Sequence, residues 1–169
     1  MTVICAETSA DWAAIHDVNV CAFGRDNEAR LVDALRTSST FVPPLSLVAV
    51  DADRIVGHIL FSRIHIRTAA GDVPALALAP MAVLPERQRG GVGATLIRHG
   101  LDAARRLGHR IVVVVGHPGY YPRFGFVPAR ARGLDAPFPD AAFMVQELAP
   151  GALEGVRGTV EYPPAFASV

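Results

Sequence analysis

Residues 73 to 115 contain three kinds of segment in an order that restricts the fold. Val73 to Leu84 is apolar throughout and Ile111 to Val115 is a β-branched run, whereas Gly91 to Leu107 carries apolar residues at helical spacing. An unbroken β-branched run is typical of a strand that is buried on both faces. The helical spacing predicts an amphipathic helix that ends near Gly108. Strand, helix and strand in this order predict a parallel crossover.

Shorter patterns on both sides complete an α/β chain. Further strands are expected at residues 2–6, 45–50, 55–66, 126–127 and 143–148, a further edge strand near 160–164, and helices after Ser9 and after Asp26 or Asn27. We expect Trp12 in the core and residues 38–44 in a loop. Because Pro80 cannot donate a ladder hydrogen bond, the strand that contains it should bulge or splay there. The stretch 129–142 has turn residues and little periodicity, so a long loop is predicted.

The bulk composition favours one domain and excludes several classes of protein. The chain has 169 residues, of which 51% are hydrophobic, and its formal net charge is zero. A core of ordinary size is therefore available, and no general charge draws the protein to nucleic acid or to an anionic membrane. We expect residues 1–150 to form the functional domain and residues 151–169 to form an extension that packs on it.

The cysteines and the N-terminus bear on the compartment. Cys5 and Cys21 form neither a disulfide framework nor a zinc motif, and residues 1–7 have no basic, apolar leader pattern. The longest apolar run is broken by prolines and is too short to cross a bilayer. We therefore expect a soluble, cytoplasmic protein without a metal site. A homodimer remains open.

A glycine-rich loop joins the apolar strand to the helix. It reads Gln88-Arg89-Gly90-Gly91-Val92-Gly93-Ala94. Glycines allow the backbone N–H groups to approach an anion, and a helix N-terminus adds partial positive charge. A dinucleotide fingerprint would require Gly at Leu96, and a P-loop would require Lys, which the chain lacks. The remaining pattern resembles the pyrophosphate loop of the GNAT superfamily of acyl-coenzyme A-dependent acyltransferases.

A second motif follows the β-branched strand. In His117-Pro-Gly-Tyr-Tyr121-Pro-Arg-Phe-Gly125-Phe126 the spacing from Tyr121 to Gly125-Phe126 matches a superfamily element. In that family the tyrosine lies near the thioester sulfur and often protonates the leaving thiolate. The alternative is that Tyr121 is an ordinary packing aromatic. The asparagine that often precedes this tyrosine by seven residues is replaced by Val114, so we expect the cofactor contacts of that region to differ from those of the family.

The resemblance extends over nearly the whole chain and is nearest to the YhbS-like branch of predicted N-acetyltransferases. It implies a mixed sheet, mostly antiparallel with a parallel central pair of strands, and acetyl-CoA as the acyl donor. It also implies that the cofactor contacts Tyr121 and the residues Met81, Ala82, Val83, Gln88, Arg89, Gly90, Gly91, Val92, Gly93 and Ala94. The acceptor would be an amine on a small molecule or a peptide.

Three residues are candidates for proton transfer. The resemblance implies that Tyr121 protonates the thiolate and that a backbone N–H near Val83 polarises the thioester carbonyl. His117 ends the buried strand, where it can take the proton of an attacking amine or, alternatively, bond a backbone group and shape the turn. Glu28, acting through water, is the second candidate base. The implied reaction is direct attack in a ternary complex, and the rival function is a non-catalytic acyl-CoA-binding sensor.

Overall fold

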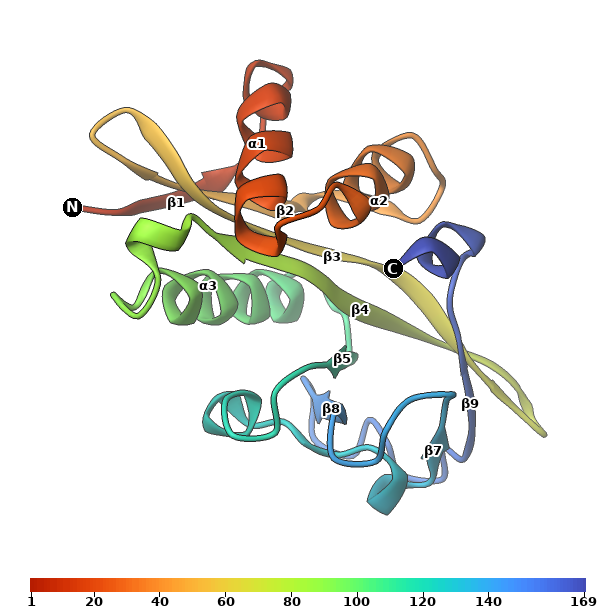
Figure 1. Ribbon diagram of the computed structural model, residues 1–169. Helices are drawn as coiled ribbons and strands as arrows, with labels where there is room; N and C mark the ends of the chain where they lie inside the picture. The colour runs from red at the N-terminus through yellow and green to blue at the C-terminus, as the bar shows by residue number, and fades with distance from the viewer.

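A computed structural model describes residues 1–169. The centre of the fold is one mixed sheet against which the helices pack (Figure 1). Its strands run in the order β1-β2-β3-β4-β5-β8-β6, and β9 joins β3 and β7 at one end. The strands are β1 (Val3–Ala6), β2 (Phe41–Asp51), β3 (Arg54–Thr68), β4 (Gly71–Val83), β5 (Ile111–Val115), β6 (Val127–Pro128), β7 (Leu134–Asp135), β8 (Phe143–Glu147) and β9 (Gly158–Glu161). The pairs β4–β5 and β7–β9 are parallel, and all others are antiparallel. This confirms the predicted fold class.

Helices cover both faces of the sheet. Figure 1 shows α1 and α2 on one face and α3 on the other. The helices are α1 (Trp12–Phe23), α2 (Asn27–Arg36) and α3 (Val92–Arg106), and short 3₁₀ turns lie at Ser9–Asp11, Pro85–Arg87, Tyr121–Phe124, Arg130–Arg132 and Pro164–Ser168. The apolar stripe of α3 is buried through Leu96, Ile97, Leu101 and Ala104, as its spacing predicts. No helix has both the length and the apolar character needed to cross a membrane.

The central strands β4 and β5 pair over a short distance and then separate. Their register joins Leu76 to Val112 and Ala77 to Val113 only. Two residues farther along β4, the predicted bulge is present: Phe61 of β3 pairs with Leu78 and Ile59 pairs with Met81, so residues 79–80 face a single residue of β3. The carboxyl-terminal part of β4 therefore has one edge that is paired with β3 and one edge from which β5 has diverged.

The C-terminal residues pack against the sheet and a helix. β9 pairs antiparallel with residues 65–68 of β3, and Asn27 Nδ2 of α2 donates to the carbonyl oxygen of Ser168 at 2.7 Å. The stretch 129–142, expected to be a long loop, contains a 3₁₀ turn and the two-residue strand β7. These contacts attach the last residues to the same sheet as the rest of the chain.

Two local expectations from sequence were wrong. Trp12, which we expected in the core, is 47% exposed, and the guanidinium of Arg36 lies 4.8 Å from the centre of its ring. Residues 38–44, expected to be a loop, include the start of β2 at Phe41. The pairing of β2 with β3 is interrupted between Phe41 and Ser46, which spans both prolines of that stretch. Proline cannot donate a ladder hydrogen bond, so the local sequence indicates a loop. In the folded protein, pairing with the distant strand β3 makes this stretch part of an irregular strand.

Candidate active site

The N-terminus of α3 presents backbone N–H groups that the helix does not use. Gly91 precedes the helix with φ 88° and ψ 0°, a left-handed conformation that favours glycine. The first helical hydrogen bond runs from Thr95 N–H to the Gly91 carbonyl oxygen at 3.0 Å. The N–H groups of Val92, Gly93 and Ala94 therefore have no acceptor within the helix. Together with the helix dipole they form a site suited to an anion.

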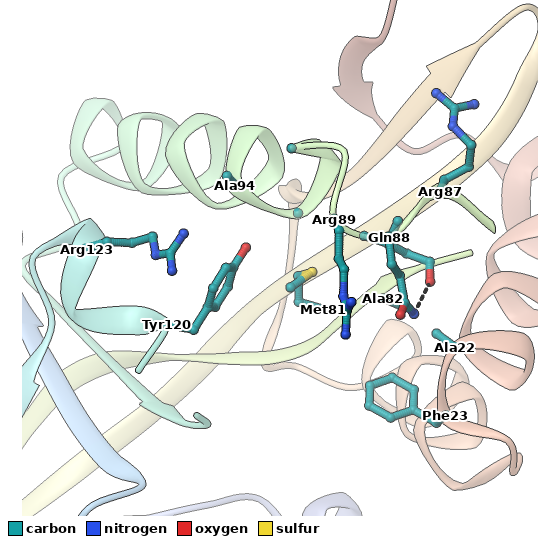
Figure 2. A pocket seen from close by; sticks show the side chains of 13 residues that line it. Ala22, Phe23, Met81, Ala82, Arg87, Gln88, Arg89, Ala94, Tyr120 and Arg123 are labelled. Carbon is teal, nitrogen blue, oxygen red and sulfur yellow. Dashed lines mark hydrogen bonds between the residues drawn. The ribbon is translucent and has the colours of Figure 1, made fainter. Parts of the chain in front are cut away.

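The loop before α3 is fixed to the end of β4. Gln88 Nε2 donates to the Val83 carbonyl oxygen at 3.0 Å, the bond drawn in Figure 2, and Arg87 pairs with Asp51 at 2.6 Å. Arg89 has a positive φ of 64°. A non-glycine residue in this region is strained, and such strain is often found at ligand-binding turns. These contacts hold the loop in one place next to the open edge of β4.

A cavity of about 430 Å³ lies where this loop, β4 and the first turn of α3 meet. Figure 2 shows Tyr120 and Arg123 at one end and Ala22 and Phe23 of α1 at the other. Its lining is formed by Ala22, Phe23, Met81, Ala82, Val83, Arg87, Gln88, Arg89, Gly91, Gly93, Ala94, Tyr120 and Arg123. Eight of the residues that sequence predicts for cofactor binding are in this set. Gly90, Val92 and Tyr121 are not, and the Val92 side chain is buried against the sheet beside Gly57.

The backbone of β4 offers a donor to the cavity. Leu84 N–H donates to the Val56 carbonyl oxygen of β3 at 2.9 Å. Backbone groups of successive residues in a strand point to opposite edges. The N–H of Val83 therefore points to the edge from which β5 has diverged, and Val83 itself lines the cavity. A carbonyl oxygen held at that edge can accept this hydrogen bond.

Adjacent tyrosines occupy different environments. Tyr120 lines the cavity, and its hydroxyl lies 3.1 Å from the position a Cβ would take on Gly93, beside the first turn of α3. Its pKa is raised by partial burial, an effect that nearby Arg123 and Arg98 oppose. Tyr120 is thus placed at the end of the cavity where an anion would sit.

Tyr121 lies deeper, at the carboxyl end of β5. Its ring atoms come within 2.3 Å of the position a Cβ would take on Gly116, so only glycine fits beside it. The side chain is buried, and its ring centre lies 5.7 Å from that of Phe126. Burial raises the pKa of Tyr121 to about 12, with a further contribution from Tyr120. The phenol therefore keeps its proton at neutral pH and can act as a donor.

The two candidate bases are held by neighbours. His117 is exposed, and its Nδ1 accepts a hydrogen bond from Gly119 N–H at 3.0 Å, which matches the turn-shaping alternative. Glu28 is buried in the first turn of α2, where Nε of Arg25 donates to Oε1 at 2.9 Å and Nη2 to Oε2 at 2.5 Å. Neither side chain lines the cavity. To accept a proton directly, His117 would have to give up its hydrogen bond from Gly119, and Glu28 would have to give up its pairing with Arg25. Alternatively, either residue would act through water.

Comparison with known proteins agrees with this geometry. Residues 5–129 match the family model described as an acetyltransferase (GNAT) domain. The chain belongs to the GNAT acetyltransferase family. Among its relatives are two uncharacterized N-acetyltransferases of Escherichia coli K12. YjhQ is 41% identical over 145 residues, covering 82% of this chain and 80% of YjhQ, and YhbS is 38% identical over 149 residues, covering 86% of each.

Solved structures of GNAT proteins superpose closely on this chain. YhbS from E. coli in complex with CoA gives a TM-score of 0.91 at 33% identity, with 98% of this chain and 92% of that chain covered. A GNAT acetyltransferase from Brucella melitensis in complex with acetyl-CoA gives 0.81 at 33% identity, with 98% of each chain covered. These agreements confirm the sequence-based recognition of the superfamily and of its YhbS-like branch.

Several residues of this GNAT cavity were not predicted from sequence. They are Ala22, Phe23, Arg87, Tyr120 and Arg123. Ala22 and Phe23 come from α1, which no motif connects with the glycine loop. Arg123 lies on the 3₁₀ turn that follows Tyr120, three residues after it, and the distance from its guanidinium to the centre of the Tyr120 ring is 4.9 Å. In the sequence, only the i, i+3 spacing of Tyr120 and Arg123 indicates that their side chains share one face of the chain.

Proposed function

We propose that the protein transfers an acetyl group from acetyl-CoA to an amine by direct attack, with donor and acceptor bound together. The observation that carries this proposal is the cavity itself. It joins an anion site at the start of α3 to an open strand edge, and Tyr121 packs against Gly116 at the end of the diverging strand β5. An anion site and an open edge in one cavity suit a ligand with a pyrophosphate at one end and a reactive carbonyl at the other.

The residues present fit the donor molecule. The free N–H groups of Val92, Gly93 and Ala94 face the place of the pyrophosphate, and Arg89 lines the same cavity as a cation. Gly93 leaves little room for a side chain there, since a Cβ would lie 3.1 Å from the Tyr120 hydroxyl and 3.2 Å from Met81 Cε. We infer that Gln88 to Ala94 hold the pyrophosphate and that Met81, Ala82 and Val83 bind the pantetheine arm along β4.

The proposed chemistry requires a hydrogen-bond donor for the carbonyl oxygen of the thioester and a proton donor for its sulfur. When bound, acetyl-CoA supplies an acetyl group activated as a thioester. The Val83 N–H donates to the carbonyl oxygen, where negative charge develops as the amine attacks. Tyr121 donates its proton to the departing sulfur, and with a pKa raised to about 12 the phenol holds this proton at neutral pH until the transfer.

The amine must lose a proton during the reaction. We propose His117 as the acceptor, because it is exposed and directly follows Gly116, against which Tyr121 packs. The proton would enter at Nδ1, in exchange for the hydrogen bond from Gly119. Glu28, acting through water, is the second candidate. We also propose a cytoplasmic location, which the two free cysteines support.

The test is the release of free thiol from acetyl-CoA in the presence of a panel of amines. We expect intersecting initial-velocity lines, as a ternary complex requires. Tyr121→Phe should lower kcat about 100-fold with little change in the dissociation constant for CoA, because only the transition state loses its proton donor. Tyr162→Phe, which removes the hydroxyl of a half-buried tyrosine outside this cavity, is the matched control and should retain wild-type turnover.

Other outcomes would decide against parts of the proposal. Parallel velocity lines would indicate an acyl-enzyme intermediate in place of direct attack. Wild-type turnover of Tyr121→Phe would show that this residue only packs. Binding of CoA without thiol release, for every amine of the panel, would favour the non-catalytic sensor.

A further inference from the structure

A second, smaller hollow lies next to the proposed cofactor cavity along the outer face of α3. Its volume is about 250 Å³, and it is lined by Arg98, Leu101, Asp102, Arg105, Arg123 and Phe124. Arg123 also lines the first cavity, so the two hollows are adjacent. A ligand that leaves the first cavity past Arg123 would enter the second one directly.

Two arginines of this hollow are held against aromatic rings and not by carboxylates. The guanidinium of Arg98 lies 5.1 Å from the centre of the Phe124 ring, and that of Arg123 lies 4.9 Å from the centre of the Tyr120 ring. Neither takes part in an ion pair, whereas Arg105 is paired with Asp102 at 3.1 Å. A guanidinium that is supported by a ring and not neutralised keeps its N–H donors for a phosphate.

Helix geometry selects between the arginines. Arg98 follows Ala94, the last residue of the anion site, by four positions, which is about 6 Å along the axis at roughly 1.5 Å per residue. Arg105 follows it by eleven positions, or about 16 Å. In CoA a single ribose separates the pyrophosphate from the 3′-phosphate. A 3′-phosphate would therefore come within reach of Arg98 and Arg123, and Arg105 lies too far along the helix.

The floor of the hollow suits the remainder of the nucleotide. Leu101 and Phe124 are buried side chains at its base, with exposed fractions of 3% and 8%. An apolar and aromatic base beside two cations matches a phosphorylated ribose with a flat, uncharged ring attached.

We propose that Arg98 and Arg123 bind the 3′-phosphate of CoA and so make the protein discriminate CoA from 3′-dephospho-CoA. This rests on the proposed placement of the pyrophosphate at the start of α3. Because both side chains are exposed, their contribution should be sensitive to salt.

The experiment is calorimetric titration with CoA and with 3′-dephospho-CoA. We expect wild-type protein to bind CoA about 10-fold or more tightly than 3′-dephospho-CoA, a difference that shrinks at high salt. Arg98→Gln, which lines only the second hollow, should weaken the binding of CoA and leave that of 3′-dephospho-CoA unchanged. Arg123→Gln, whose side chain also lines the first cavity, should weaken the binding of CoA more than that of 3′-dephospho-CoA. Glutamine keeps part of the side-chain stem, so packing on the rings is largely retained.

Arg106→Gln is the matched control, because Arg106 is on the same helix but lines the groove beside β1. It should change neither dissociation constant. Equal affinity of the wild-type protein for both ligands, or equal weakening of both by the arginine variants, would overturn the 3′-phosphate site alone. Failure of both ligands to bind wild-type protein would instead contradict the placement of the cofactor.

Discussion

His117 stands where a proton acceptor and a turn former would both be placed. Its Nδ1 accepts from Gly119 N–H at 3.0 Å, so an asparagine at this position can supply an oxygen acceptor to the same backbone group without titrating near neutral pH. If His117 is the base, we expect both His117→Asn and His117→Ala to lose the acidic limb of the kcat/KM profile. The rate should fall about 100-fold in each, with cofactor binding intact in calorimetry.

The asparagine variant separates the two roles. A rate close to that of wild-type protein in His117→Asn, together with a lower melting temperature in His117→Ala only, would show that the side chain shapes the turn. An acidic limb that persists in slow but stable variants would assign the base elsewhere, and Glu28 would be the next residue to replace.

At the level of single residues, the sequence predicted the glycine loop better than the aromatic cluster. Glycine spacing between a strand and a helix indicates backbone geometry directly, so the loop at residues 88–94 was predicted from its sequence context, and five of its seven residues line the cavity. Tyr120 immediately precedes the 3₁₀ turn that begins at Tyr121, and the side chains of successive residues there point in different directions. The motif selected Tyr121, yet Tyr120 lines the cavity. The path of the chain after β5 in the folded protein places Tyr120 in the cavity lining and Tyr121 against Gly116, and the motif does not specify this.

At the level of elements, the start of α3 is the part of the site that is most easily tested. Gly93→Glu would place bulk and negative charge among the free N–H groups, where Tyr120 and Met81 leave little space. We expect no detectable binding of CoA in calorimetry. His99→Glu adds the same charge to the same helix on the side that faces β1 and should bind CoA normally. Unchanged affinity in a folded Gly93→Glu protein would place the pyrophosphate elsewhere.

Helices and strands were predicted correctly where a single local sequence pattern specifies the type of element. β4, α3 and β5 have apolar spacing that specifies both type and burial, and the bulge follows from Pro80 alone. The short strands β6 and β9 were predicted only with shifted bounds, and β7 was not predicted, because these strands depend on partners far away in the chain: β9 pairs with β3, and β7 pairs with β9. Two or four residues carry too little periodicity to define a strand, so their pairing depends on the tertiary structure.

At the scale of the whole molecule, a buried polar chain joins both N-terminal helices to the sheet. Arg36 of α2 donates to Glu7 through Nε at 2.8 Å and Nη2 at 3.2 Å, and Glu7 accepts from Ser46 Oγ of β2. His58 of β3 lies 2.9 Å from Ser46 through Nε2 and 3.4 Å from Asn19 Nδ2 of α1 through Nδ1. Because Ser46 donates to Glu7, His58 donates through Nε2 and accepts at Nδ1. The arrangement therefore requires a neutral imidazole.

Protonation of this histidine should unfold the protein at mildly acidic pH. Burial, with a smaller effect from the charge of Arg36, lowers the pKa of His58 to about 3. The unfolded chain, with an ordinary histidine pKa of about 6.5, binds the proton more readily, so stability is complete above that pH and falls as pH decreases toward 3. The loss is on the order of a few kcal/mol. We expect the melting temperature of wild-type protein to fall between about pH 7 and pH 4.

His58→Gln should flatten this dependence while lowering the melting temperature at neutral pH, because the amide cannot be protonated but fits the polar chain less well. His65→Gln is the matched control on the same strand. His65 is half exposed beside Asp72 at 3.7 Å, and an exposed pair of this kind contributes little to stability. The control should therefore keep the wild-type slope. An equally steep slope in His58→Gln would show that other groups, such as the carboxylate of Glu7, cause the acid unfolding, and that the buried histidine only fills its place between α1 and the sheet.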